Sequence, residues 1–310
     1  MTNKIIYGAP MAGVTDKPFR QMCRKFGNQV LFTEMIGVSS LYNHSLVTQK
    51  MMRIQDEENL IVQLVGIDIP AMIYSAKIAE DNGAIGIDIN MGCPVRKLIT
   101  NGSGCAFMKS IDNAVRVVEA VKNSVSLPVS VKTRLGWDND HINILPFAQR
   151  LADCGISQIT VHARTKEQGY SGKADWEMVQ KVKESVDIPV IVNGDIVSKE
   201  TQEQALTITN ADGVMIGRGL LGKPWLLNEI ETGQKQSYHL TELVLEHLDK
   251  MMSYYGQAGL YASRKHLAWY AKGLVGSADF CNQMFREDSV TIVQQLIKSF
   301  FSQTNDKEVL

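Results

Sequence analysis

The chain has 310 residues, of which 45% are hydrophobic and 21% charged, a balance that is ordinary for a globular protein. Its net charge of −1 provides no basic field over the whole molecule, so a nucleic-acid partner would have to bind a local cationic patch. The five cysteines are scattered without a CxxC pair and the six histidines lack ligand spacing, so we expect reduced thiols and no metal.

Short β-branched runs alternate with longer amphipathic stretches up to about residue 220. We expect strands within the runs 5–11, 29–36, 59–66, 84–92, 127–134, 157–164, 187–195 and 211–219. The stretches between them, such as 112–125 and 175–186, have apolar residues three and four apart, which is typical of amphipathic helices. Eight successive βα units predict an α/β fold, a (β/α)8 TIM barrel with parallel strands.

An open doubly wound sheet is the alternative arrangement of such units. It would place a glycine-rich turn after the first strand, whereas residues 9–16 (APMAGVTD) contain no GxGxxG motif. The sequence therefore favours the closed barrel.

The pattern changes near residues 232–240, a polar stretch that contains a glycine. After it, helical periodicity returns three times, in residues 241–256, 262–274 and 288–301, and the last of these begins with the capping sequence DSVT. We therefore expect two domains, a catalytic TIM barrel over residues 1–236 and a small C-terminal helical domain over residues 237–310.

No apolar run approaches the roughly 18 residues that a membrane helix requires. The N-terminus enters strand-like sequence almost at once, so we expect no signal peptide. These features predict a cytoplasmic protein without membrane contact, and we expect it to be a monomer.

The carboxyl ends of the strands carry the active site in barrels of this kind. Nearly every predicted strand ends there with polar or charged side chains, often beside a glycine. These strand-end residues are Pro10, Met11, Ala12, Gln63, Asn90, Cys93, Lys132, Arg134, His162, Arg164, Asn193, Gly194, Asp195, Gly217 and Arg218. Each alone has an ordinary structural explanation, but their joint occurrence indicates a site. Asp88, two residues before Asn90, is assigned to the scaffold.

The last two strand ends are suited to a phosphate. Gly194 and Gly217 allow close approach of the backbone, and the Arg218 guanidinium can donate two hydrogen bonds to the anion. On the opposite side, the Gln63 amide can pair with ring N–H and C=O groups, and Lys132 can neutralise charge on a reduced ring. The residues predict a phosphate-bearing ligand, and flavin mononucleotide (FMN) combines a phosphate with such a ring.

The chain resembles the tRNA-dihydrouridine synthases, most closely the bacterial B type. The matching phrases are APMAGVTDKPFR (9–20), QLVG (63–66), DINMGCP (88–94), VKTRLGWD (131–138), HARTKEQGYSG (162–172), PVIVNGD (189–195) and MIGRGLLGKPW (215–225). The helical tail matches as well, in EHLDKMMSYYG and RKHLAWYAKGL, so the likeness covers almost the whole chain.

The resemblance implies an FMN enzyme that reduces a uridine in the D-loop of tRNA, with NADPH as the source of electrons. It assigns Cys93 as the proton donor and places Asn90, Arg134 and Arg164 near the substrate. The residues that it implies for FMN contact are Pro10, Met11, Ala12, Gln63, Lys132, His162, Asn193, Gly194, Asp195, Gly217 and Arg218. The additional thiol of Cys105 is assigned to packing.

A cysteine suits the proposed chemistry at its position. The C5=C6 bond of uracil is conjugated with the C4 carbonyl, so we hypothesise that hydride passes from flavin N5 to C6 and a proton from Cys93 to C5. A thiol with a pKa of about 8.5 is protonated at neutral pH yet acidic enough to donate. Gly92 allows a sharp turn and Pro94 stiffens it, so the corner aims the thiol.

The helical domain offers a candidate contact for RNA. Residues 262–270 place the cations Arg264 and Lys265, with His266, beside Trp269 and Tyr270, which predicts a narrow cationic stripe with stacking surfaces. Extraction of the target base from the folded tRNA would draw on such contacts.

Three other functions remain open at the level of sequence. An FMN barrel acting on a free pyrimidine, similar to dihydroorotate dehydrogenase, would turn over its substrate without RNA. An aldolase-type barrel, with Lys132 forming a Schiff base to a phosphorylated sugar, would be colourless and trapped by borohydride. An RNA-binding protein without chemistry would not need both Cys93 and Lys132.

Overall fold

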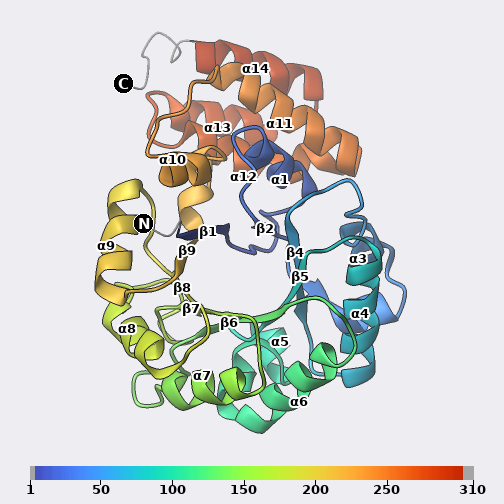
Figure 1. Cartoon of the computed structure of the whole chain (residues 1–310). Coiled ribbons are helices and arrows are strands. Elements are labelled where there is room, and N and C mark those ends of the chain that lie inside the picture. Colours follow the sequence, from blue (N-terminus) through green and yellow to red (C-terminus); the bar gives the residue numbers. More distant parts are fainter. Residues whose placement is uncertain (1–3, 303–310) are drawn as a thin grey trace. The chain divides into compact units, whose positions relative to one another are not determined.

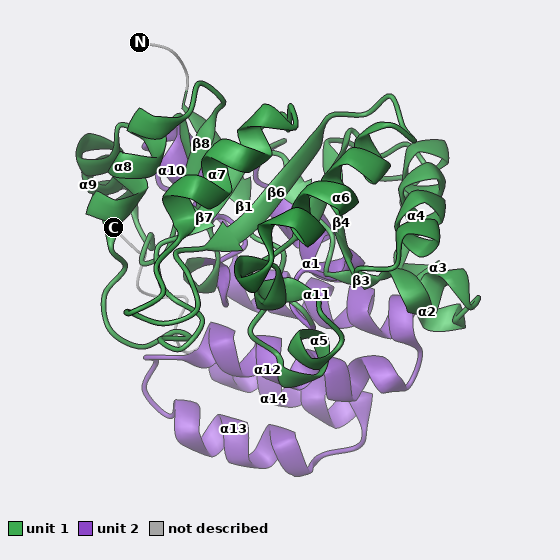
Figure 2. Ribbon diagram, turned by 90° about the horizontal axis from the view of Figure 1, so that it is seen from below, with its two compact units in different colours: residues 1–12, 28–219 green, residues 13–27, 220–310 purple. Residues whose placement is uncertain are grey.

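The computed structural model describes residues 4–302 of the chain. Internal contacts divide these residues into two compact units. The barrel unit comprises residues 4–12 and 28–219, and the helical unit comprises residues 13–27 and 220–302 (Figure 2). Within residues 4–302, no helix is both long enough and apolar enough to cross a membrane.

Parallel strands form a closed barrel in the barrel unit. They are β1 (Ile5–Gly8), β2 (Leu31–Phe32), β3 (Ile36–Gly37), β4 (Leu60–Val65), β5 (Gly86–Asn90), β6 (Val129–Arg134), β7 (Ile159–His162), β8 (Val190–Asn193) and β9 (Gly213–Ile216). Their order is β1-β9-β8-β7-β6-β5-β4-β2, and a parallel bridge between Tyr7 and Val30 closes the ring (Figure 1). The predicted TIM barrel is confirmed, and the open doubly wound sheet is excluded.

The second predicted strand, residues 29–36, is split into β2 and β3, which both pair with β4. The Oγ1 atom of Thr33 accepts a hydrogen bond of 3.0 Å from the main-chain N–H of Gln63, between the two pairings. The Thr33 hydroxyl thus replaces a main-chain acceptor at this point of the ladder. The predicted strand is therefore interrupted between β2 and β3.

The inner face of the barrel has a polar and an apolar side. Side chains two residues apart in a strand share a face, and residues paired in register across parallel strands lie side by side. Asp88 is paired with Gln63 on β4 and with Ser130 on β6, and Asn90 is paired with Lys132. An apolar cluster of Tyr7, Ala9, Phe32, Ile61, Ile191 and Met215 forms the other side, and Ile61 of β4 lies two residues before Gln63.

Amphipathic helices follow the strands of the barrel unit. They are α2 (Val38–Tyr42), α3 (Leu46–Met51), α4 (Ile69–Asp81), α5 (Arg96–Thr100), α6 (Ile111–Lys122), α7 (Ile144–Asp153), α8 (Trp176–Ser185) and α9 (Lys199–Thr209). The predicted helices at 112–125 and 175–186 correspond to α6 and α8. The start of α8 is set by Asp175, whose side chain accepts the Met178 N–H at 3.0 Å.

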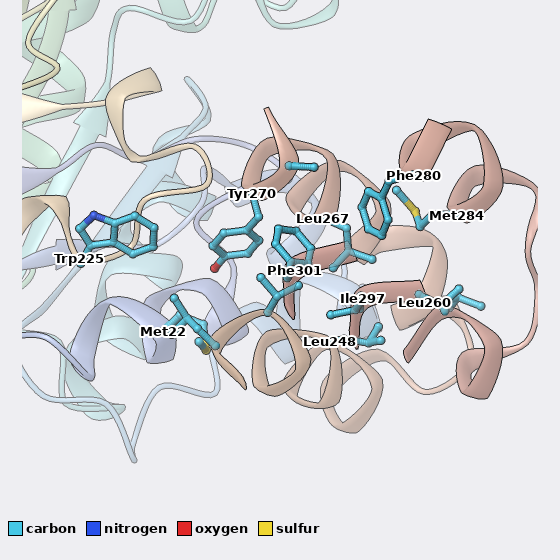
Figure 3. Close-up of a cluster of buried hydrophobic side chains, with 14 residues drawn as sticks. Met22, Trp225, Leu248, Leu260, Leu267, Tyr270, Phe280, Met284, Ile297 and Phe301 are labelled. Atoms are coloured by element: carbon cyan, nitrogen blue, oxygen red, sulfur yellow. The ribbon is translucent and has the colours of Figure 1, made fainter. Parts of the chain in front are cut away.

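The helical unit has its own apolar core. Its helices are α1 (Lys17–Arg24), α10 (Leu226–Thr232), α11 (Leu240–Tyr255), α12 (Ala258–Ala271), α13 (Ser277–Arg286) and α14 (Val290–Ser302). The cluster in Figure 3 includes Leu248 of α11, Leu267 of α12 and Ile297 of α14, each at most 1% exposed. Burial of side chains of this kind stabilises the unit by roughly 1.5–3 kcal/mol each.

The division between the units differs from the expected boundary after residue 236. The helical unit already begins at residue 220, and it includes the segment 13–27 with α1. Met22 of α1 joins the apolar core, and Asp16, which caps α1, accepts a hydrogen bond of 3.0 Å from the Tyr255 hydroxyl. The first motif, residues 9–20, is therefore shared between two units, which no local sequence signal reveals.

Candidate active site

The corner after β5 holds its cysteine by main-chain hydrogen bonds. Asn90 Oδ1 accepts the N–H groups of Gly92, at 3.2 Å, and Cys93, at 2.9 Å. The Cys93 carbonyl accepts the Cys105 N–H at 3.0 Å. Gly104 has a φ of +60°, and a Cβ atom there would lie 2.6 Å from the Cys93 carbonyl oxygen, so this position requires glycine. The predicted corner is thus fixed from both sides.

The Cys93 side chain is only 8% exposed. Burial raises the pKa of its thiol, while a main-chain hydrogen bond and the charges of Arg134 and Lys132 offset part of that effect. The thiol is therefore protonated at neutral pH, as a proton donor must be. Cys105 is fully buried, and its Sγ donates to a main-chain carbonyl at 3.1 Å, which fits the expected role in packing.

Lys132 projects from the neighbouring strand β6. Its Nζ donates to Asn193 Oδ1 at 3.1 Å, and the Asn193 amide donates in turn to the Met215 carbonyl at 2.8 Å. Burial, followed by the charge of Arg134, lowers the pKa of Lys132 to about 8. An ammonium has three N–H donors. Because the contacts among the described residues use one of them, two remain for a ligand.

Two arginines at the strand ends brace the loop after β7. Arg134 donates to the carbonyls of Gly92, Thr165 and Gly169 at 2.9, 3.0 and 2.8 Å. Arg164 donates to the carbonyls of Ser171 and Gly172 and to both carboxylate oxygens of Asp195. Arg134 and Arg164 are each at most 2% exposed, so their hydrogen bonds shape the site from within. Contact of either residue with the substrate stays a prediction.

The ends of β8 and β9 form a glycine-rich group beside a cation. Gly194 has a φ of +120°, and a Cβ atom at Gly217 would lie 3.8 Å from the Met11 sulfur, which places the end of β1 next to that of β9. The Arg218 side chain is half exposed and lies over the Tyr170 ring, at 5.1 Å from its centroid. These groups can present backbone N–H donors and a guanidinium to an anion.

His162, at the end of β7, is neutral in this environment. Burial, and then the charge of Lys132, lowers its pKa to about 2. A Cβ atom at Gly194 would lie 3.2 Å from the His162 ring, so the glycine makes room for the imidazole. The neutral ring, the free donors of Lys132 and the glycine-rich cation site together fit a flat ring with a phosphate tail.

Asp88 was assigned to the scaffold from the sequence, and the structure corrects this assignment. Its carboxylate points into the barrel, where Gln63 Nε2 donates to it at 2.6 Å and Ser130 Oγ at 2.7 Å. The spacing to Asn90 was the available signal, because residues i and i+2 of a strand share a face.

A second group that the sequence did not indicate combines loops after β5, β6 and β7. The Lys109 and Lys166 ammonium groups lie 3.4 and 4.4 Å from the centroid of the Trp137 ring. Among the described residues, neither lysine has an ion pair, and Lys109 is exposed. Two unneutralised cations on one ring favour an anionic partner.

The predicted RNA contacts of the helical unit are arranged differently from the expectation. Arg264 lies over the ring of Tyr261, at 4.7 Å from its centroid, and donates to the Glu287 carbonyl and to Asp288. His266 and Tyr270 are buried in the core, because they lie on the inner face of α12. The stacking partner of the arginine is therefore the exposed Tyr261. Lys265 reaches toward Gly13, where a Cβ atom would lie 3.4 Å from its Nζ.

Comparison with known proteins gives consistent matches over most of the chain. A family model described as dihydrouridine synthase matches residues 7–305. The probable tRNA-dihydrouridine synthase 1 of Synechocystis is 42% identical over 95% of this chain and 85% of its own length. The tRNA-dihydrouridine synthase B of Pseudomonas syringae is 38% identical over 97% of this chain and 94% of its own length.

Solved structures share the barrel at low sequence identity. A 2-naphthoyl-CoA reductase complex has a TM-score of 0.59 at 11% identity, over 74% of this chain and 50% of that one. An old yellow enzyme homologue from Zymomonas mobilis has a TM-score of 0.54 at 13% identity, over 77% of this chain and 91% of that one. At these identities the likeness concerns the fold alone.

Proposed function

The chain belongs to the dihydrouridine synthase family, and from this premise we propose that it reduces the C5=C6 bond of a D-loop uridine in tRNA, with FMN as cofactor and NADPH as reductant. The observation that carries the proposal is the protonated thiol of Cys93, held on a rigid corner at the mouth of the barrel. A scaffold would have no need to hold an acidic group there by its main chain on both sides.

The residues proposed to hold FMN surround the same strand ends. Arg218 and the backbone at Gly194, Asp195 and Gly217 would take the phosphate, while Gln63, Lys132, His162 and Asn193 would contact the ring, together with Pro10, Met11 and Ala12. When bound and reduced by NADPH, FMN would supply hydride to C6 of the uridine. Lys132 would hold a positive charge against the flavin ring. Its hydrogen bond to Asn193 positions the ammonium group.

Cys93 completes the reduction in this proposal. Its thiol donates a proton to C5, from the face of the pyrimidine opposite to the hydride donor. Burial keeps the thiol protonated, and the hydrogen bond of its N–H to Asn90 keeps it in place. The Asn90 amide, whose second N–H is not used by the network, is suited to contact the substrate.

An RNA substrate, in preference to a free pyrimidine, is supported by groups outside the pocket. The cluster of Lys109, Trp137 and Lys166 lies on loops at the carboxyl ends of the strands and is suited to phosphates of the strand that carries the target base. In the helical unit, the exposed Tyr261 ring lies against the partly buried Arg264 guanidinium, which combines a stacking surface with a cation, and Lys265 adds a second charge. We further propose that the protein acts as a cytoplasmic monomer.

Mass spectrometry of tRNA tests the function directly. A strain that lacks this gene should lose dihydrouridine at one or more D-loop positions, and the wild-type chain should restore it while Cys93→Ala should not. The purified protein should absorb in the flavin bands. An unchanged dihydrouridine content in the deletion strain, or turnover of free uridine without RNA, would refute the proposal.

A further inference from the structure

Asp88 is a buried carboxyl that the proposed reaction does not use. It is fully buried on β5, and its hydrogen-bond partners are the neutral groups of Gln63 and Ser130. Burial raises its pKa to about 6, and the two hydrogen bonds and the charge of Lys132 oppose that rise. At neutral pH the ionised carboxylate therefore costs stability, and an apolar side chain would serve the scaffold better.

A chain of hydrogen bonds connects this carboxylate to the corner that carries the thiol. Asp88 Oδ2 accepts from Gln63 Nε2 at 2.6 Å, and Gln63 Oε1 accepts from Asn90 Nδ2 at 2.9 Å. Asn90 Oδ1 then accepts from the N–H groups of Gly92 and Cys93. Three side chains on two neighbouring strands thus form one continuous network.

The direction of every hydrogen bond in this network is determined by its ends. The N–H groups of Gly92 and Cys93 can only donate, so Asn90 must turn its oxygen toward them and its amide nitrogen toward Gln63. Gln63 must then turn its oxygen to Asn90 and its nitrogen to Asp88, which as a carboxylate can only accept. The reverse orientation of either amide would place donor against donor.

The network leaves a defined set of unused polar atoms on two buried side chains, Gln63 at 0% and Asn90 at 6% exposure. Gln63 retains one N–H and one lone pair, and Asn90 retains one N–H. Because neither amide can rotate, the edge that Gln63 presents has a fixed pattern of donor and acceptor. Without the carboxylate, the Gln63 amide nitrogen would lose its buried acceptor, and the Asn90 N–H alone would hold the orientation of the Gln63 amide.

We propose that Asp88 is a positioning residue, whose carboxylate fixes the donor and acceptor face of Gln63 toward the bound ring and steadies the Asn90 corner that aims Cys93. This inference rests on the proposed function, since Gln63 and Cys93 have these roles only in a flavin-dependent uridine reductase. Asp88 itself contacts neither ligand.

Two substitutions of similar size separate the acceptor from the charge. Asp88→Asn can still accept from Gln63 through its oxygen and donate to Ser130, whose hydroxyl can turn to the Ile87 carbonyl at 3.4 Å. Asp88→Leu removes the acceptor. We expect Asp88→Leu to weaken FMN binding by about tenfold or more, the loss typical of a broken hydrogen bond to a charged group, and Asp88→Asn to stay within about threefold of the wild type.

Alkylation of Cys93 by iodoacetamide, followed by peptide mass spectrometry on the protein without flavin, measures the corner separately. Asp88→Leu should change the rate by severalfold, whereas Asp88→Asn should not. The control is Asp212→Asn, which removes a barrel carboxylate that pairs with Lys183 outside the network. At pH 7.5 the melting temperature of Asp88→Asn should equal or exceed that of the wild type, because the costly ionised group is gone.

An exchange of the two side chains tests the direction of the network even if Asp88→Leu does not fold. In the double variant Asp88→Asn with Asn90→Asp, every hydrogen bond can form again with the Gln63 amide reversed, at unchanged composition. We expect a folded protein with FMN affinity lowered by about tenfold or more. Wild-type FMN affinity in this double variant, or an unchanged alkylation rate in Asp88→Leu, would overturn the inference. A wild-type protein that neither binds FMN nor forms dihydrouridine would refute the proposed function instead, and the alkylation result would still test the network.

Discussion

The two units bury titratable side chains in opposite ways. Inside the barrel, Lys132 and Asp88 have hydrogen-bond partners and sit in one polar half of the wall. In the core of the helical unit, His247 and His266 lie with ring centroids 4.6 Å apart, and the Nε2 atom of each lacks a hydrogen-bond partner within residues 4–302. Burial, and then neighbouring positive charge, lowers the pKa of His247 to about 3.

The difference is between buried groups joined in a hydrogen-bond network and buried groups that pack mainly as rings. The Lys132 ammonium keeps two donors beyond its hydrogen bond to Asn193, and the Asp88 carboxylate accepts from Gln63 and Ser130. The histidines of the helical unit are neutral rings, and His266 stacks on Phe19 with centroids 5.6 Å apart. The Nδ1 atom of His247 lies 3.0 Å from the Tyr270 hydroxyl, so a hydrogen-bond partner alone does not mark a buried titratable group as functional.

The largest effect should follow from Cys93→Ala. Without the proton donor, we expect the rate of uridine reduction in tRNA to fall by roughly 10²–10⁴-fold. The flavin absorbance and its bleaching by NADPH should remain, because Cys93 is not among the residues proposed to hold the ring. Cys154→Ser, at the end of α7, is the matched control. Full activity of Cys93→Ala would contradict the role of Cys93 as the proton donor.

Replacement of Lys132 should come next. Lys132→Met should lower FMN affinity by roughly tenfold or more, as for other hydrogen bonds to charged groups. Because the lysine loses its proton as the pH rises through about 8, activity of the wild type should decline above that pH. Lys132→Arg keeps its charge, so its profile should lack this decline. Stopped-flow measurement of flavin reduction across pH 6.5–9.5 compares the pH profiles of the wild type and Lys132→Arg. Identical profiles would contradict the assignment of the decline to Lys132.

The histidines of the helical unit should make stability depend on acid. In the unfolded chain a histidine has a pKa of about 6.5, whereas in the folded unit the pKa of His247 is about 3. The unfolded state therefore binds more protons below pH 6.5, and stability should fall by up to about 1.4 kcal/mol per pH unit for each histidine.

Differential scanning calorimetry between pH 7.5 and pH 5 measures this decline. His266→Phe, which preserves the stacking on Phe19, should reduce it by about a third, since His162 of the barrel is also buried with a lowered pKa and one of three such histidines is removed. Phe280→Leu, in the same apolar core, removes no titratable group and should leave the slope as it is. An equal acid dependence in the wild type, His266→Phe and the control would show that the buried histidines are not neutral in the folded protein.

The smallest effect concerns RNA affinity at the barrel mouth. Lys109→Ala with Lys166→Ala removes two cations, so the slope of log K against log salt concentration for tRNA should become shallower by about 1.5. Filter binding or fluorescence anisotropy from 50 to 300 mM salt would measure the slope. Lys181→Ala, on the exposed side of α8, is the control. An unchanged slope would assign the anionic partner to other residues.

Local sequence patterns were enough to predict the barrel and the strand ends that carry the candidate site. β-branched runs and helical periodicity are local patterns, and each of the eight predicted runs contains a strand. Parallel strands end at one edge, so Gln63, Cys93 and Lys132 were brought to the same region by topology alone. The corner at Gly92–Pro94 was likewise readable, because glycine and proline restrict the backbone locally.

Which side chains contact one another could be read only from the folded chain. The network from Asp88 to Cys93 depends on the register between neighbouring strands, and the pairing of Lys109 and Lys166 on Trp137 depends on three loops far apart in the chain. The segment 13–27 joined the helical unit because Met22 packs into its core. Contacts of this kind arise from packing between distant segments, and composition or periodicity within one segment carries no record of them.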